Sequence, residues 1–157
     1  MKIFLNIIRG IVITYLVIFA LIVVILFTKR KIYKEVLPTV IDGYSYIIVG
    51  GNALAPDIES GKLLIFEKTS SYSEGDYIIY QDGEKYLVAK ITENELYKYK
   101  VLNENNETVN LEDKDLLAKV VYNNSLFSTI IKILINPITL VILLFVGTIF
   151  PELVYDK

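Results

Sequence analysis

An apolar run near the N-terminus constrains this chain more than any other feature. Gly10 to Phe27 carries no charged side chain over 18 residues. As an α-helix this run would be about 27 Å long, close to the hydrocarbon core of a bilayer. It is longer than the apolar region of a cleaved signal peptide, and no small-x-small cleavage site precedes Lys29. The sequence therefore predicts a transmembrane helix over residues 10–28, with a buried core helix as the alternative.

A second apolar run lies near the C-terminus. Ile133 to Phe150 is also uncharged over 18 residues, although Asn136 and Pro137 lie near its start. Proline is tolerated in membrane helices where neighbouring groups satisfy the backbone. The sequence predicts a second transmembrane helix over residues 133–150, again with a buried core helix as the alternative.

The segment between the two runs has a different composition. Residues 36–128 contain 8 basic and 15 acidic side chains, a net charge of −7, which gives no support for nucleic-acid binding. The chain has no cysteine and no histidine. This excludes a thiol nucleophile, a cysteine-based zinc site and a Ser-His-Asp triad. No metal or cofactor is expected.

Short stretches rich in β-branched and aromatic residues run through this middle segment. Strands are predicted over residues 44–49, 62–68, 77–81, 86–92, 96–102 and 117–122. Asp82-Gly83 supplies the positive φ of a tight hairpin turn. The expected fold is mainly β: a small antiparallel barrel-like domain over residues 36–128, flanked by N- and C-terminal transmembrane helices.

The stretch from Val49 to Lys68 combines a Gly-Gly turn, a short apolar run, a proline bend and an apolar strand. It resembles the first motif of the signal peptidase I family, Gly-Ser-Met-x-Pro-x-Ile followed by a glycine and a strand. Four further stretches are similar to that family, mostly to its endoplasmic-reticulum-like branch, and follow in the same order: residues 75–80, 88–91, 102–106 and 117–121. The resemblance covers most of the chain and implies a signal-peptidase-type β domain.

The resemblance also implies where a catalytic site would lie. In the family a serine attacks the scissile carbonyl, and a lysine or histidine takes its proton. The nucleophile position here is Ala53, the base position is Ala89, and the loop carboxylate position is Glu104. Two methyl groups can neither attack nor accept a proton. The candidates for a substrate groove are Asn52, Leu54, Pro56 and Ile58.

Neighbouring side chains are poor replacements for the missing pair. Lys90 follows Ala89, and because side chains alternate along a strand it is expected to point away from the site. Ser45 and Ser60 do not align with the nucleophile. The other acidic side chains near the site are expected to be solvated loop charges: Asp57, Glu59, Glu104 and Glu107.

Three functions remain open on the sequence. The first is a membrane-anchored, inactive signal peptidase-like protein that binds or presents exported precursors, or scaffolds the assembly of surface fibres. The second is an active signal peptidase that uses unusual residues. The third is a membrane-anchored structural or interaction module. The expected partners are the lipid bilayer and exported precursor proteins or signal peptides.

Two features of the sequence indicate opposite orientations in the membrane. Basic residues beside the first apolar run, Lys29 to Lys34, favour a cytoplasmic domain by the positive-inside rule. The resemblance implies an extracytoplasmic domain with both termini in the cytoplasm. Because long loops translocate largely regardless of charge, we expect a multi-pass cell-membrane protein with its β domain outside.

Overall fold

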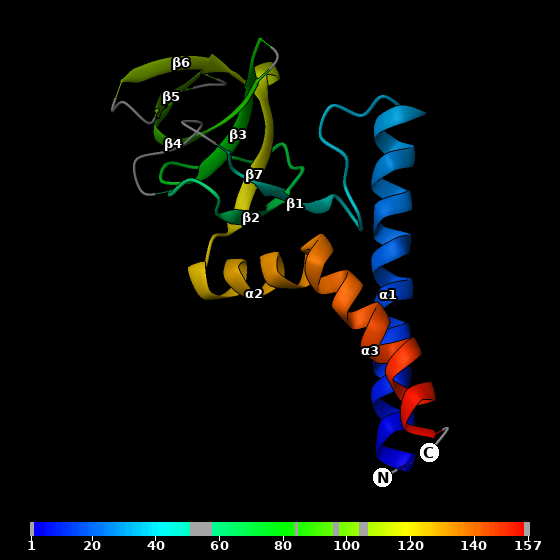
Figure 1. Ribbon diagram of the computed structural model, residues 1–157. Coiled ribbons are helices and arrows are strands. Elements are labelled where there is room, and N and C mark those ends of the chain that lie inside the picture. Colours follow the sequence, from blue (N-terminus) through cyan, green and yellow to red (C-terminus); the bar gives the residue numbers. More distant parts are fainter. Residues whose placement is uncertain (1, 51–57, 84, 96–97, 104–106, 156–157) are drawn as a thin grey trace. The chain divides into compact units, whose positions relative to one another are not determined.

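The computed structural model describes residues 2–50, 58–83, 85–95, 98–103 and 107–155. The chain divides into two compact units. One unit contains residues 1–35 and 130–157 and is helical, and the other contains residues 36–129 and is built on a β-sheet (Figure 1).

The N-terminal apolar run forms one long helix, α1 (Lys2–Lys31). Most of its apolar side chains are exposed. The part from Asn6 to Lys31 is long and apolar enough to cross a membrane. Lys29, Arg30 and Lys31 occupy its last turn, where positive charge interacts favourably with the helix dipole.

The C-terminal apolar run is interrupted. Helix α2 (Ser125–Ile135) ends just before Asn136, and α3 (Pro137–Tyr155) continues at an angle of 62°. The single helix expected over residues 133–150 is therefore wrong. The cause is local, because Asn136 accepts the Ile138 N–H on its side-chain oxygen at 2.8 Å and so caps α3. Pro137 at the first helical position has no N–H with which to continue α2.

Helix α3 packs against α1 at a point of close approach. A Cβ atom placed on Gly147 would lie 2.7 Å from the Cγ1 atom of Val12, so a larger residue does not fit there without movement. Nearby along α1, the Tyr15 hydroxyl donates a hydrogen bond of 2.9 Å to the Leu134 carbonyl at the end of α2. Small residues at such contacts let helix backbones approach closely.

The second unit is mainly β. Its seven antiparallel strands are β1 (Tyr44–Ile48), β2 (Leu63–Glu67), β3 (Tyr77–Asp82), β4 (Lys85–Glu95), β5 (Lys98–Leu102), β6 (Thr108–Glu112) and β7 (Leu116–Tyr122). They pair in the order β1-β2-β7-β3-β4-β5-β6 (Figure 1). Across the strands that the structure describes, β1 and β6 are edges, so the expected closure into a barrel is not observed.

The sequence located six of the seven strands. The hairpin predicted at Asp82-Gly83 is confirmed, and Gly83 has a φ of 59°, in the left-handed region that glycine enters freely. Strand β6 was not predicted, although its residues alternate between polar and apolar. A 3-10 turn, η1 (Asp113–Asp115), connects β6 to β7.

Two apolar clusters form the core, and side-chain alternation along β3 and β4 assigns them to opposite faces of the sheet. We call the first the loop-side cluster, made of Leu37, Val49, Ile58, Leu64, Phe66, Ile79, Val88, Ala118 and Val120. We call the second the tyrosine cluster, made of Tyr72, Ile78, Tyr80, Ala89, Ile91, Tyr99, Val101, Leu111 and Leu116. A register shift in β7 lets that strand contribute to both clusters.

One row of directly paired residues crosses the loop-side face. It runs through Ser45, Phe66, Val120, Tyr77 and Lys90. Directly opposed residues of antiparallel strands point to the same face. The row therefore places the Ser45 hydroxyl and the Lys90 amine on the same side of the sheet. Three strands, β2, β7 and β3, lie between β1 and β4.

Candidate functional site

The residues expected to form the site fall partly outside the described segments. Those that lie outside them are Asn52, Ala53, Leu54, Pro56 and Glu104. Ile58 and Ala89 are described, and both are buried. The candidate site is therefore defined by the residues at its borders.

The segment that carries the nucleophile position is held at both ends. The Val49 N–H donates to the Lys62 carbonyl at 3.0 Å, and the Gly61 N–H donates to the Val49 carbonyl at 2.7 Å. Val49 and Ile58 are both buried members of the loop-side cluster. The segment between them thus starts and ends against the loop-side face of the sheet.

Ala89, the expected base position, belongs to the other face. It lies opposite Ile78 on β3, has no exposed surface and packs in the tyrosine cluster. Leu87 and Ile91, two residues before and after it on β4, pack on that same cluster. The spacing of these three apolar residues is the sequence signal that could have identified Ala89 as a core residue.

Lys90 faces the opposite way from Ala89, as side-chain alternation along the strand predicted. Its neighbour Val88 belongs to the loop-side cluster, and alternation places Lys90 on that face. The Lys90 Nζ atom lies 5.4 Å from the ring centroid of Tyr77, which packs against the same cluster. Lys90 therefore shares a face of β4 with Val88, and so with Val49 and Ile58.

The end of β5, which precedes the expected carboxylate position in the sequence, lies beside Lys90 in the sheet. Leu102, the last residue of β5, pairs directly with Lys90. The next residue, Asn103, accepts the Glu107 N–H on its side-chain oxygen at 2.9 Å, and its side-chain amide donates to the Glu107 carboxylate at 3.1 Å. Glu107 is exposed, as expected for a solvated loop charge, and so is Glu59.

The two serines weighed as substitutes differ in environment. Ser60 is exposed in a turn. Ser45 on β1 is only 6% exposed, and within the described part of the chain its hydroxyl has no hydrogen-bond partner. Three strands separate β1 from β4, so Ser45 and Lys90 share a row without being neighbours in it.

A residue of the stretch 75–80 forms an ion pair with a residue of the stretch 117–121, close to Lys90. The Lys119 ammonium on β7 lies 2.7 Å from a carboxylate oxygen of Asp76, and that oxygen also accepts the Ser73 N–H at 2.8 Å. The Gly75 N–H donates to the Ile91 carbonyl, and the Ile91 N–H donates to the Asp76 carbonyl. These contacts fix the start of β3 against β4 and β7, next to Tyr77 and Lys90.

Among the strands that the structure describes, β1 lies at an edge of the sheet, next to the residues that lead into the loop. Because the Val49 N–H points toward β2, alternation directs the backbone groups of Tyr46 and Ile48 away from β2. The outward groups of Tyr44 are already bonded to residues 40 and 41. The backbone positions left to accept a further strand are therefore those closest to the loop.

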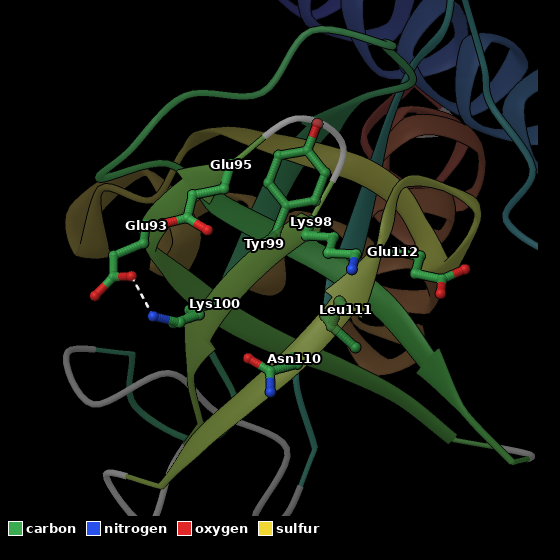
Figure 2. Close-up of a pocket in the computed structure, with 8 residues that line it drawn as sticks. All are labelled: Glu93, Glu95, Lys98, Tyr99, Lys100, Asn110, Leu111 and Glu112. Carbon is green, nitrogen blue, oxygen red and sulfur yellow. Dashed lines mark hydrogen bonds and ion pairs between the residues drawn. The ribbon is translucent and has the colours of Figure 1, made fainter.

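A separate hollow of about 360 Å³ lies over β4, β5 and β6 (Figure 2). Its lining alternates in charge, with Glu93 ion-paired to Lys100, and consists of Glu93, Glu95, Lys98, Tyr99, Lys100, Asn110, Leu111 and Glu112. Ile58 and Ala89, the described residues predicted for the site, are not among its lining residues. Its acidic and basic side chains are those expected of a solvated face of a curved sheet.

Comparison with protein-family models gives no match, and comparison with curated proteins gives none. What the site can do chemically is therefore inferred from its own residues. They provide a free strand edge, an anchored loop and one lysine on the loop-side face.

Proposed function

We propose that this chain is a membrane-anchored, signal peptidase I-like protein that does not hydrolyse peptide bonds. Its β domain binds an extended segment of an exported precursor along the free edge of β1. It thereby holds or presents the precursor, or organises the assembly of surface fibres.

The case for inactivity starts with the loop composition. Residues 50–57 read Gly-Gly-Asn-Ala-Leu-Ala-Pro-Asp and include no serine, threonine or cysteine. No side chain in this loop can act as a hydroxyl or thiol nucleophile. The burial of Ala89 in the tyrosine cluster is the observation that carries the proposal, because the expected base position serves the core and not the loop.

The edge of β1 supports peptide binding. An extended chain that pairs with the backbone of Tyr46 and Ile48 would lengthen the sheet by one strand, and this mode of recognition needs no catalytic side chain. Its direction along β1 would bring the peptide to the loop that begins after Val49. Small side chains of the peptide would then meet Asn52, Leu54, Pro56 and Ile58, the groove candidates.

The length and apolar surface of α1 support membrane anchoring. In the proposed arrangement both apolar runs enter the membrane, both termini are cytoplasmic and the β domain is extracytoplasmic. Protease added to intact cells or spheroplasts should digest the β domain. A domain that becomes accessible only after the cells are lysed would contradict this orientation.

Peptide binding can be tested with the full chain in nanodiscs and a fluorescent peptide that ends in an Ala-x-Ala sequence. We expect Ile48→Pro to abolish binding, because proline removes the outward N–H without removing a bond to β2. The matched control is Ile48→Val, which keeps the N–H and should bind as the parent does. Equal binding by both variants would exclude the β1 edge, and no binding by the parent would favour a purely structural module.

A second candidate function, an active peptidase, is favoured by one observation. Lys90 is an amine on the face that carries both ends of the loop. Incubation of the full chain with a secretory precursor distinguishes the two candidates. We expect no cleavage by the parent, whereas cleavage that disappears in Lys90→Met but persists in Lys62→Met would establish the active enzyme.

A further inference from the structure

The break at Asn136 leaves α3 too short to cross a bilayer on its uncharged part alone. Pro137 to Phe150 contains 14 uncharged residues, about 21 Å of helix, against a hydrocarbon core of about 30 Å. Any C-terminal span must therefore include residues that precede the break.

Helix α2 has the surface that such a span requires. Leu126, Ile130 and Ile133 recur at helical spacing and are 76%, 57% and 57% exposed. Ser128 lies on the other side of the helix, where its hydroxyl accepts the Leu63 N–H at 2.6 Å. Lys132, one turn after Ser128, shares this polar side. We call the three exposed residues the α2 stripe.

Exposed apolar residues also follow on α3. Beyond the bend, Ile138, Val141 and Phe145 are also exposed at helical spacing. Exposed apolar residues at helical spacing on two successive helices have the composition of a lipid-facing surface.

Two of the polar groups at the break have partners outside the helix ladder. The Leu134 carbonyl accepts the Tyr15 hydroxyl, and the Ile138 N–H donates to the side chain of Asn136. Helix breaks are tolerated within a bilayer only where neighbouring groups satisfy the backbone in this way.

The position of Tyr15 indicates the depth of the break. Tyr15 lies within the uncharged run of α1, five residues after Gly10 and about 21 Å along the helix from Lys29. Its contact with Leu134 places the break beside the apolar part of α1.

We infer that the C-terminal membrane segment is one bent span that starts with α2, with the α2 stripe against phospholipid acyl chains and the break inside the hydrocarbon layer, where Tyr15 satisfies it. This inference rests on the membrane anchoring in the proposed function and is independent of peptide binding. It also implies that Ser128 ties the first residue of β2 to a helix that enters the membrane.

The chain contains no tryptophan, so a single introduced indole reports on one position. We would place the full chain with Leu126→Trp, Ile133→Trp or Val141→Trp in phosphatidylcholine vesicles brominated near the headgroup or near the chain end. We expect shallow bromines to quench Leu126→Trp and deep bromines to quench Ile133→Trp and Val141→Trp. Thr108→Trp, at an exposed position of β6, is the unquenched control.

Each outcome decides between alternatives. Quenching of Val141→Trp without quenching of Ile133→Trp and of a second stripe variant, Ile130→Trp, would show that protein covers the stripe and would overturn the inference. Loss of quenching at all these positions would overturn both the inference and the C-terminal anchor, while peptide binding at β1 could still be measured.

The role of Tyr15 is tested by adding Tyr15→Phe to Ile133→Trp. Without the hydroxyl, the Leu134 carbonyl lacks its partner, and we expect the quenching of the indole to shift from deep to shallow bromines. Tyr33→Phe, which removes an exposed phenol, should leave the indole quenched by the deep bromines. Unchanged depth in Tyr15→Phe would show that Tyr15 does not hold the break.

Discussion

The Nζ atom of Lys119 on β7 lies 2.7 Å from the Oδ2 atom of Asp76 at the start of β3. Both side chains are partly buried, and Asp76 also accepts the Ser73 N–H. A charged pair with this additional hydrogen bond contributes more than a fully exposed pair. It fixes the start of the strand that carries Tyr77.

Asp76→Asn should lower the free energy of unfolding by about 1–2 kcal/mol, because the amide cannot replace the charge-assisted contact with Lys119. The thermal midpoint of the full chain in detergent, followed by circular dichroism, measures the change. Glu59→Gln alters an exposed carboxylate and should leave the midpoint unchanged. Equal midpoints for Asp76→Asn and the parent would show that the pair is dispensable.

Ala89→Lys should destabilise the β domain by about 3–5 kcal/mol, because it places an unpaired ammonium among apolar side chains. Lys90→Ala, one residue further along β4, should cost less, because the contact of Lys90 with the Tyr77 ring contributes about 1 kcal/mol or less. Urea unfolding of both variants gives the comparison. If Ala89→Lys were as stable as Lys90→Ala, the assignment of faces on β4 would be wrong.

The difference in stability expected between Ala89→Lys and Lys90→Ala determines how reversion to an active enzyme should be tested. Ala53→Ser combined with Ala89→Lys is expected to unfold before it can show any chemistry. Ala53→Ser alone keeps the core intact and leaves Lys90 on the loop-side face. Both variants should therefore be assayed beside the parent.

Alkaline pH should weaken the tyrosine cluster through Tyr72. Burial, followed by the charges of Asp113 and Tyr99, raises the pKa of the Tyr72 phenol from its usual 10.0 to about 12. Because the pKa is higher in the folded chain than in the unfolded chain, the contribution of Tyr72 to stability is complete below about pH 10 and is lost as the pH rises toward 12.

Tyr72→Phe has no phenol at this position. As the pH rises from about 10 to about 12, its free energy of unfolding should therefore fall less than that of the parent, by at most about 2 kcal/mol. Urea unfolding at a series of pH values measures the difference. Tyr33→Phe is the control and should follow the parent. Parallel pH profiles for Tyr72→Phe and the parent would contradict the role of Tyr72.

Val12→Cys combined with Gly147→Cys should form a disulfide between α1 and α3. A Cβ atom on Gly147 would lie 3.3 Å from the Cβ atom of Val12, close to the distance of about 3.5–4.5 Å in disulfides. The chain has no other cysteine to compete. A change in gel mobility after mild oxidation detects the bond.

The control pairs Val12→Cys with Ile138→Cys, which lies about 13.5 Å from Gly147 toward the start of α3. This pair should stay reduced under the same conditions. If both pairs, or neither, became cross-linked, the close approach at Gly147 would be excluded.

The sequence predicted the β architecture well because local chemistry decides it. The β3–β4 hairpin follows from Asp82-Gly83 between two runs rich in β-branched and aromatic residues. Strand β6 was missed because its polar residues at every second position read as a loop. The break at Asn136 was underestimated, since the apolar run continues past it and hides the capping amide.

The directions of the site side chains were harder to predict. Both faces of β4 carry apolar residues, so alternation alone does not say which face meets the loop. The contacts of Val88 and Ala89 with different clusters decide it. No local property of Ala89 or Lys90 contains the information that Val49 and Ile58 pack beside Val88.

The row from Ser45 to Lys90 depends on the register between β3 and β4. If β4 slipped by one position against β3, the directions of all its side chains would be exchanged. Ala89 would then face the loop, and Lys90 would enter the apolar core. The register between β3 and β4 thus decides, with no substitution at either residue, whether an amine or a methyl group faces the loop.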